Sequence, residues 1–291
     1  MAEERKGTIY GTEKSNVKFS AKVLSYPCGL QDIVVCSDPC FGPGGWEQRD
    51  QPPKGPKQGS RKTTDPTAED RERSMRRARA QVRRLALAND FRWFVTLTLD
   101  GAKIDRHDMN AIVKRLNAWC SNMVQRHGLK YILVPERHQD GAIHFHGFFN
   151  DSVKAVDSGT IKPASGGKPK RPRNEKQRQQ MIAEGGHIVY NLPSWSLGFT
   201  TAIELYGEYT AAVGYVCKYI GKDGDKPAGR WYYSGGDLAQ PKVDYGDIFI
   251  EELKEEYGKK VMLFNVPGKA IAIVNGIKTD CTQPSTEEVT K

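Results

Sequence analysis

A hairpin signal in the middle of the chain constrains the fold more than any other feature. Segments 131–137 and 142–149 both have the composition of strands, and the residues between them end in Asp140-Gly141, a turn-forming pair. A three-residue turn with Gly141 in the left-handed conformation would pair Glu136 with His144. Glycine stands where that turn needs it, so the sequence favours this register.

Two histidines follow the turn on the second strand. Successive strand residues point to opposite faces, so His144 and His146 share one face, while Phe145 points into the opposite layer. Two neutral imidazoles form half of a divalent-metal site, and a carboxylate from Glu136 would complete a set suited to a phosphate-activating cation. A two-residue turn would instead place Arg137 beside the histidines, and the favoured register also brings His138 to that face as a reserve ligand.

The flanking segments indicate an α+β fold. Helical patterns span 65–88, 106–127 and 208–220, and strand patterns span 91–99 and 197–204. We therefore expect a central antiparallel sheet with helices on its faces, in a domain over residues 65–250. Residues 1–64, rich in glycine and proline after position 41, predict an irregular N-terminal arm. Residues 151–185 predict an exposed basic insertion, and residues 251–291 a C-terminal extension with a disordered tail.

Charge and composition narrow the partners. Lys and Arg number 44 against 35 Asp and Glu, a formal net charge of +9, which favours a polyanion such as nucleic acid. No apolar run is long enough for a membrane span, and the charged start lacks a secretory signal, so we expect a cytoplasmic protein. Cys28, Cys36 and Cys40 cluster, but a fourth zinc ligand is missing, and reduced thiols are favoured.

The first helix is strongly basic. It could follow a phosphate backbone, although a solvated arginine face explains the same pattern nearly as well. The side chains predicted to contact DNA are Arg73, Arg76, Arg77 and Arg83, together with Lys222 farther along the chain.

The last helix of the domain carries a second reactive group. Tyr215, Lys218, Tyr219 and Lys222 recur at i, i+3, i+4 and i+7 and form one stripe, opposite an apolar stripe that packs into the core. A tyrosine hydroxyl is a weak nucleophile at neutral pH, so it needs a polarised target and a nearby cation such as Lys218.

Three motifs in this order resemble the HUH endonucleases, specifically the double-tyrosine rolling-circle replication initiators (Rep) of small single-stranded DNA phages and plasmids. The motifs are Phe94-Val-Thr-Leu-Thr98, His144-Phe-His146 and Tyr215-Val-Cys-Lys-Tyr219. The resemblance implies an HUH or RRM-like palm for the fold.

The resemblance also implies a mechanism. Glu136, His144 and His146 would bind Mg²⁺ or Mn²⁺ against the scissile phosphate of single-stranded or extruded origin DNA. Tyr215 would cut, leaving a 5′-phosphotyrosine and a 3′-hydroxyl primer, and Tyr219 would act in the reverse transfer that rejoins the strand. The sequence contains no nucleotide-binding Gly-x-x-x-x-Gly-Lys-Ser/Thr motif, so a bacterial host would supply the helicase and the DNA polymerase.

Two other interpretations stay open at this point. A relaxase or transposase of the same superfamily would use the same chemistry, although the order of the motifs argues against a relaxase. A non-catalytic origin-binding protein or repressor would need only the basic helix and the insertion.

Overall fold

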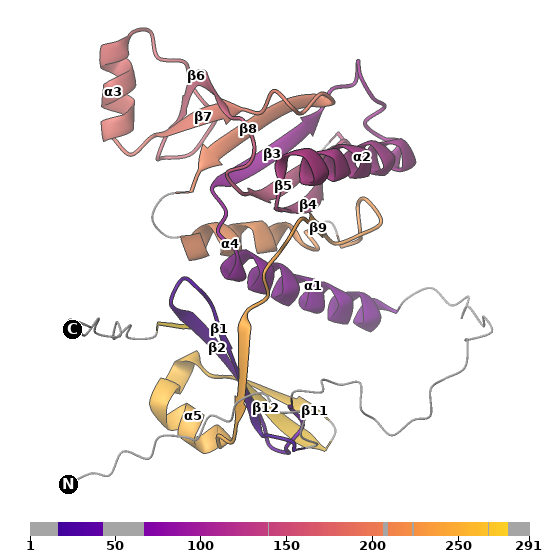
Figure 1. Cartoon of the computed structure of the whole chain (residues 1–291), viewed down its shortest axis with the longest axis vertical. Helices are drawn as coiled ribbons and strands as arrows, with labels where there is room; N and C mark the ends of the chain where they lie inside the picture. The colour runs from indigo at the N-terminus through magenta and orange to yellow at the C-terminus, as the bar shows by residue number, and fades with distance from the viewer. Residues whose placement is uncertain are drawn as a thin grey trace, which may run out of the picture. The chain divides into compact units, whose positions relative to one another are not determined.

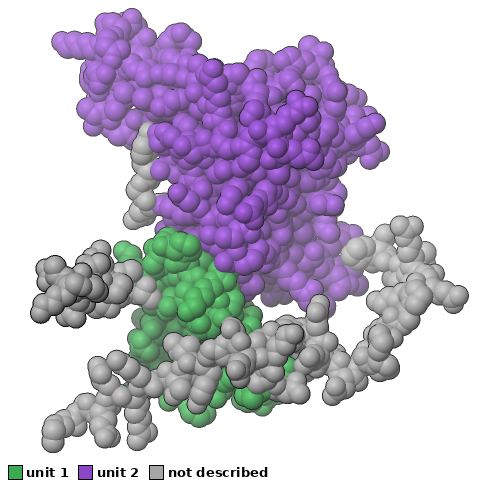
Figure 2. Space-filling model, in the orientation of Figure 1, with its two compact units in different colours: residues 1–64, 241–291 green, residues 65–240 purple. Residues whose placement is uncertain are grey.

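The computed structural model describes residues 17–42, 67–138, 140–205, 209–222, 224–266 and 268–278. The chain divides into two compact units, one formed by residues 65–240 and the other by residues 1–64 together with 241–291 (Figure 2). The expected α+β class is confirmed, since each described unit combines an antiparallel sheet with helices.

The unit of residues 65–240 is built on a seven-stranded antiparallel sheet with the order β6-β7-β8-β3-β5-β4-β9 (Figure 1). The strands are β3 Trp93–Leu99, β4 Tyr131–Arg137, β5 Ile143–Phe149, β6 Val156–Lys162, β7 His187–Asn191, β8 Gly198–Glu204 and β9 Tyr233–Gly235. The helices are α1 Ala68–Ala88, α2 Met109–His127, α3 Glu175–Ala183 and α4 Tyr209–Tyr219.

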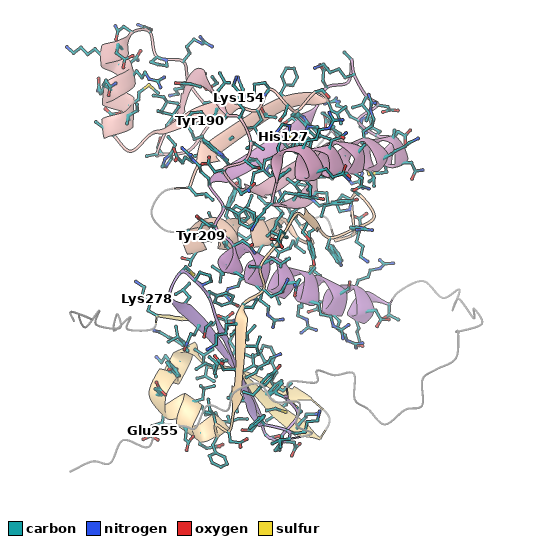
Figure 3. All side chains as sticks on the ribbon, in the orientation of Figure 1. His127, Lys154, Tyr190, Tyr209, Glu255 and Lys278 are labelled. Carbon is teal, nitrogen blue, oxygen red and sulfur yellow. The ribbon has the colours of Figure 1, made fainter. Side chains whose placement is uncertain are left out.

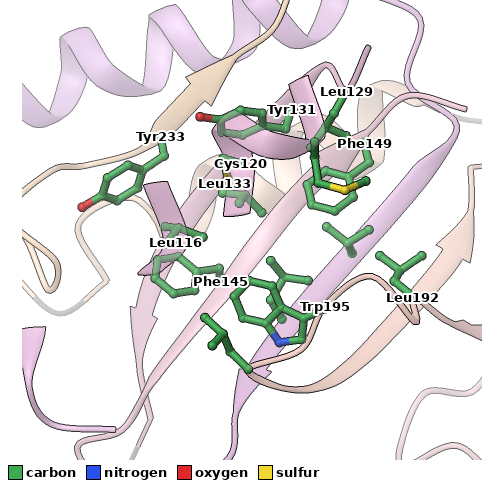
Figure 4. Packing of buried hydrophobic residues seen from close by; sticks show 14 of the residues in the cluster. Leu116, Cys120, Leu129, Tyr131, Leu133, Phe145, Phe149, Leu192, Trp195 and Tyr233 are labelled. Carbon is green, nitrogen blue, oxygen red and sulfur yellow. The ribbon is translucent and has the colours of Figure 1, made fainter. Parts of the chain in front are cut away.

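Helix α2 covers one face of this sheet. Alternate residues of β3 and β5, such as Leu97 and Phe145, are fully buried in one cluster with Ile112 and Leu116 of the helix. Phe145 and Leu116 of this cluster are labelled in Figure 4. The helix ends where the sequence predicted, because Gly128 adopts a left-handed conformation with φ of 66°. Burying each of these large apolar side chains contributes about 1.5–3 kcal/mol, which fixes the strand register on both faces of the sheet.

Helices α1 and α4 lie on the other face. Phe148 of β5 packs against Phe91 and against Tyr209 at the start of α4, with ring centroids 5.8 Å and 6.0 Å away. The Tyr209 hydroxyl, labelled in Figure 3, donates to the backbone carbonyl of Ala86 on α1 at 2.7 Å. Thr67 caps α1 by accepting from the backbone N–H of Asp70, and residues 65 and 66, where the sequence predicted its start, lie outside the described residues.

The predicted basic insertion is partly regular structure. Residues 156–162 form β6, an edge strand, and residues 175–183 form α3. Most side chains there are exposed and α3 buries none, but Ile161 is fully buried. The sequence did not predict the strand in this insertion, because β6 is stabilised by pairing with β7, which lies more than twenty residues later in the chain.

The second unit contains a five-stranded sheet with the order β10-β1-β2-β12-β11. Its elements are β1 Ala21–Ser25, β2 Leu30–Cys36, β10 Lys242–Gly246, α5 Ile250–Tyr257, a short 3-10 turn at Gly258–Lys260, β11 Met262–Val266 and β12 Lys269–Lys278.

This unit differs from the irregular arm that the sequence predicted for residues 1–64. Residues 21–25 and 30–36 form strands because β10 and β12, more than 200 residues later, supply their hydrogen-bond partners. The C-terminal residues 251–278 are likewise part of this sheet and its helix. The sequence predicted a disordered tail after Asn275, but β12 continues to Lys278, and residues 279–291 lie outside the described residues.

Candidate active site

The register of the hairpin decides which side chains meet the histidines. Glu136 pairs directly with His144, while Arg137 pairs with Ile143. Gly141 has a φ of 82°, and the His138 N–H donates to the carbonyl of Ala142 at 2.8 Å, as the longer turn requires. The register predicted from the position of glycine is confirmed, although Gln139 lies outside the described residues.

Glu136 and His146 are in direct contact on that face. The Glu136 Oε2 and His146 Nε2 atoms are 2.6 Å apart, and the other imidazole nitrogen lies 3.1 Å from the hydroxyl of Thr96 on β3. Burial lowers the pKa of His146, an effect larger than the opposing pull of the carboxylate. The imidazole is therefore neutral at pH 7, the form that can donate a lone pair to a cation.

The second histidine lies beside a third. The His144 ring stacks on that of His138 with centroids 5.0 Å apart, and its centroid is 6.4 Å from that of His146. Burial and the proximity of His138 lower the pKa of His144. His138, the predicted reserve ligand, is mostly exposed and lies 3.3 Å from the carboxylate of Asp140.

Helix α4 places its tyrosines over this face. Val213, Val216 and Ile220 of its apolar stripe are buried, so the opposite stripe is turned to the site. The Tyr219 ring stacks on His146 with a centroid distance of 4.2 Å and an interplanar angle of 9°. The Tyr219 hydroxyl donates to the Tyr215 hydroxyl at 2.5 Å.

The two tyrosines differ in their surroundings. Tyr215 is 48% exposed, and its ring meets Phe94 edge-on at a centroid distance of 5.8 Å. Burial, followed by the hydrogen bond to Tyr215, raises the pKa of Tyr219. Tyr215 is thus the hydroxyl open to a large substrate, and its oxygen accepts a hydrogen bond that would stabilise developing negative charge.

The two lysines of the stripe have different surroundings. Lys218 is exposed and, among the described residues, forms no hydrogen bond or ion pair. Lys222, predicted as a DNA contact, forms an ion pair with Glu136 and lies 5.7 Å from the centroid of the Tyr219 ring. Burial opposes ionisation of Glu136, but the hydrogen bonds from Lys222 and His146 lower the pKa of its carboxyl. The carboxylate is therefore charged at neutral pH.

The predicted arginines lie on α1 in different settings. Arg77 is exposed, while Arg73 and Arg76 are exposed and lie 3.5 Å and 3.7 Å from the carboxylates of Asp70 and Glu72. Arg83 is half-buried near Cys217.

Sequence reasoning missed the role of another arginine. Arg79 donates from Nε and Nη2 to the backbone carbonyl of Ile220, at 3.0 Å and 2.7 Å, and so holds the C-terminal end of the tyrosine helix. Its place in a basic run gave no signal that separated it from its neighbours. The contact of Thr96 with His146 was also missed, although strand periodicity places Thr96 on the same face as Thr98, which pairs with His144.

The donor set suits a divalent cation, with two imidazole nitrogens and a carboxylate adjacent on one sheet face. Within the described residues, however, no three His, Cys, Asp or Glu side chains are arranged to hold one ion. The Lys222 ammonium instead supplies the positive charge next to Glu136. A metal would thus have to displace Lys222 from the carboxylate, and the metal assignment stays a prediction.

Residues 92–224 match the model of the replication-associated protein (ORF2) family, a family of phage replication initiators. The matched segment runs from just before β3 to just after α4, so it contains both histidines, Glu136 and both tyrosines. Searches of curated proteins and of solved structures found no match. In the described part of the chain, no helix combines the length and the apolar character needed to cross a membrane.

Proposed function

We propose that this protein nicks single-stranded or extruded origin DNA to start rolling-circle replication. The observation that carries the proposal is the stacking of Tyr219 on His146, which brings the two-tyrosine helix onto the face that bears Glu136 and both histidines. The match to replication-associated proteins over residues 92–224 supports the biological setting.

Tyr215 is the nucleophile in this proposal. Its oxygen forms a bond to the scissile phosphorus while the bond from phosphorus to the 3′ oxygen breaks. The phenol loses its proton, and the departing 3′ oxygen takes one up. The products are a 5′-phosphotyrosyl enzyme and a free 3′-hydroxyl that can prime synthesis by a host polymerase beside a host helicase.

The neighbouring residues hold the reacting groups in place. The Tyr219 hydroxyl, which donates to Tyr215 in the free protein, stabilises the attacking oxygen as its proton leaves. Tyr219 then serves the later transfer, in which a new 3′-hydroxyl attacks a phosphotyrosine and rejoins the strand. Lys218, exposed on the same helix, steadies the phosphate.

Glu136, His144 and His146 would hold Mg²⁺ or Mn²⁺, and His138 is the reserve ligand. A bound ion would supply polarisation of the phosphate oxygens. The neutral imidazoles and the ionised carboxylate are in the protonation states that such ligands need.

The test uses a supercoiled plasmid that carries the protein's own replication origin. The parent should convert it to the nicked form and should form a covalent DNA adduct, both only when Mg²⁺ or Mn²⁺ is present. Tyr215→Phe should abolish adduct formation. Tyr219→Phe should slow the first cut, because the Tyr215 oxygen loses its hydrogen-bond donor, and should lose rejoining. Tyr190→Phe is the matched control, because Tyr190 packs on Trp93 away from the catalytic residues and its loss of a hydroxyl should leave nicking unchanged.

Two results would overturn the proposal. Nicking by the Tyr215→Phe/Tyr219→Phe double variant at the parental rate would exclude tyrosine chemistry. Origin binding without nicking or adduct by the parent, with either metal, would favour the non-catalytic origin-binding protein. Mapping the 5′ ends of the nicked plasmid would separate an initiator, which cuts at the origin, from a transposase or relaxase that cuts at its own element.

A further inference from the structure

One exposed aromatic side chain lies in the same cross-strand row as the candidate active site. Phe199 of β8 pairs with Thr98 of β3, Thr98 pairs with His144 of β5, and His144 pairs with Glu136 of β4. Directly opposed residues in a sheet point to the same face. Phe199 therefore faces the same side as the histidines, and its strand lies next to β3 in Figure 1.

Phe199 is unusual among the large apolar side chains of this unit. It is 67% exposed, whereas the aromatic residues on the opposite face of the sheet, such as Trp93 and Phe145, are buried. Burying such a ring contributes about 1.5–3 kcal/mol of favourable free energy, and the protein lacks this contribution while the ring is exposed. A single exposed ring needs no explanation in general, but this one continues the row of reactive side chains.

The surface between Phe199 and the histidines is formed by small polar side chains. Neighbouring strands lie about 4.8 Å apart, so two strand spacings place Phe199 about 10 Å from His144. The side chains on this face between them are Thr98 and, in the next row, Thr96 and Thr201. These small hydroxyl side chains leave room for a chain to lie across the strands and can hydrogen-bond to it.

A cation lies at the same end of the sheet. Arg106 is 3.4 Å from Asp140, whose turn follows Glu136, and its side chain is 36% exposed. The row combines an aromatic face with hydroxyl groups, and the partly exposed guanidinium of Arg106 lies beside the turn that follows Glu136. This combination fits an unpaired nucleic-acid strand, whose bases stack and whose phosphates attract cations.

We propose that Phe199 is a stacking platform for an unpaired base of a nucleotide that neighbours the phosphate at the active site. This inference rests on the proposed function, because it assigns the bound strand to the same sheet face. Stacking on an aromatic ring is tolerant of sequence, since every base has a π face. Phe199 is then a positioning residue, which holds the strand flat across β8 and β3 while the phosphate lies under Tyr215.

The test measures binding of the full chain to a fluorescein-labelled (dT)20 strand by anisotropy, with divalent ions chelated. Removing a base–aromatic stack weakens binding by about 5- to 150-fold, so Phe199→Ala should show a loss in that range. Phe199→Trp should bind like the parent, and its added tryptophan emission should be quenched by (dT)20 but not by an abasic strand of equal length. Phe199→Leu, which keeps an apolar side chain without an aromatic face, should bind like the alanine variant.

Phe249 provides the matched control. It is 68% exposed at the start of α5, in the other unit, so Phe249→Ala removes an equally exposed ring that is not part of the row. That variant should bind (dT)20 like the parent. Thermal unfolding of all variants should agree closely, because exposed positions tolerate substitution within about 0.5 kcal/mol.

The outcomes separate this inference from the proposed function. Parental binding by Phe199→Ala, equal loss in Phe249→Ala, or a change of oligomeric state in Phe199→Ala would overturn the stacking role. If Tyr215-dependent adducts persist in those cases, the nickase proposal stands. If the parent neither binds (dT)20 nor forms an adduct, both fail.

Discussion

Arg79 holds the end of the tyrosine helix, and its replacement should loosen that helix. The guanidinium donates two hydrogen bonds to the carbonyl of Ile220, a residue with only 1% of its surface exposed. Hydrogen bonds from a charged group contribute about 1.5–3 kcal/mol, and a cation at a helix C-terminus adds about 0.3–1 kcal/mol. We expect Arg79→Ala to lower the free energy of unfolding by about 2–3 kcal/mol.

The matched control is Arg76, which lies about one turn before Arg79 on helix α1. Arg76 is 3.7 Å from Glu72, and both side chains are 60% exposed. Exposed pairs at this spacing contribute about 0.3–0.5 kcal/mol, so Arg76→Ala should hardly change stability. Arg79→Lys should fall between the two, because an ammonium keeps the charge but lacks the planar fork.

Thermal unfolding followed by circular dichroism measures the difference. A loss of about 2–3 kcal/mol corresponds to about 4–12 °C in a domain of this size. Hydrogen exchange should locate the change, with faster exchange of the amides in the last turn of α4 in Arg79→Ala only. Equal melting temperatures and equal exchange in Arg79→Ala and Arg76→Ala would show that Arg79 does not support the tyrosine helix.

Two further predictions concern the sheet and its histidines. Gly147→Ala should destabilise the protein by about 1–3 kcal/mol, because a Cβ at this position would lie 1.8 Å from a backbone oxygen of β4. The control is Gly214→Ala on α4, where a Cβ would have no atom within 4 Å, so this variant should be neutral or slightly stabilised. Urea denaturation measures both. Burial lowers the pKa of His146 in the folded protein. The neutral imidazole therefore contributes fully to stability above the pKa of the unfolded state, about 6.5, and this contribution is lost as the pH falls through the pKa of the folded state. His146→Gln should flatten that part of the pH–stability curve, and an unchanged slope in the variant would contradict the buried neutral imidazole.

The elements around the site could be predicted because their signals are local. Alternation in β3, helical spacing in α2 and the glycine stop at Gly128 each act within a few residues. Even the pairing of Glu136 with His144 was decided locally, because Gly141 permits the left-handed turn that sets the register.

Contacts between distant segments could not be predicted in the same way. The strands β1 and β2 depend on β10 and β12, and the N-terminal segment alone has the composition of an arm. Lys222 and Glu136 are 86 residues apart, so the helical stripe that suggested a DNA contact could not reveal their ion pair.

By itself, the sequence favoured the observed hairpin register, and it determined the shared face of His144 and His146 and the helix that carries Tyr215 and Tyr219. Those features follow from backbone periodicity and turn chemistry, which neighbouring residues specify. Only the tertiary structure decided that Tyr219 lies on His146, that Arg79 supports the helix and that Phe199 extends the row. Each of these depends on which distant strand or helix packs alongside, and that choice is made by burial over the whole unit rather than by any local pattern.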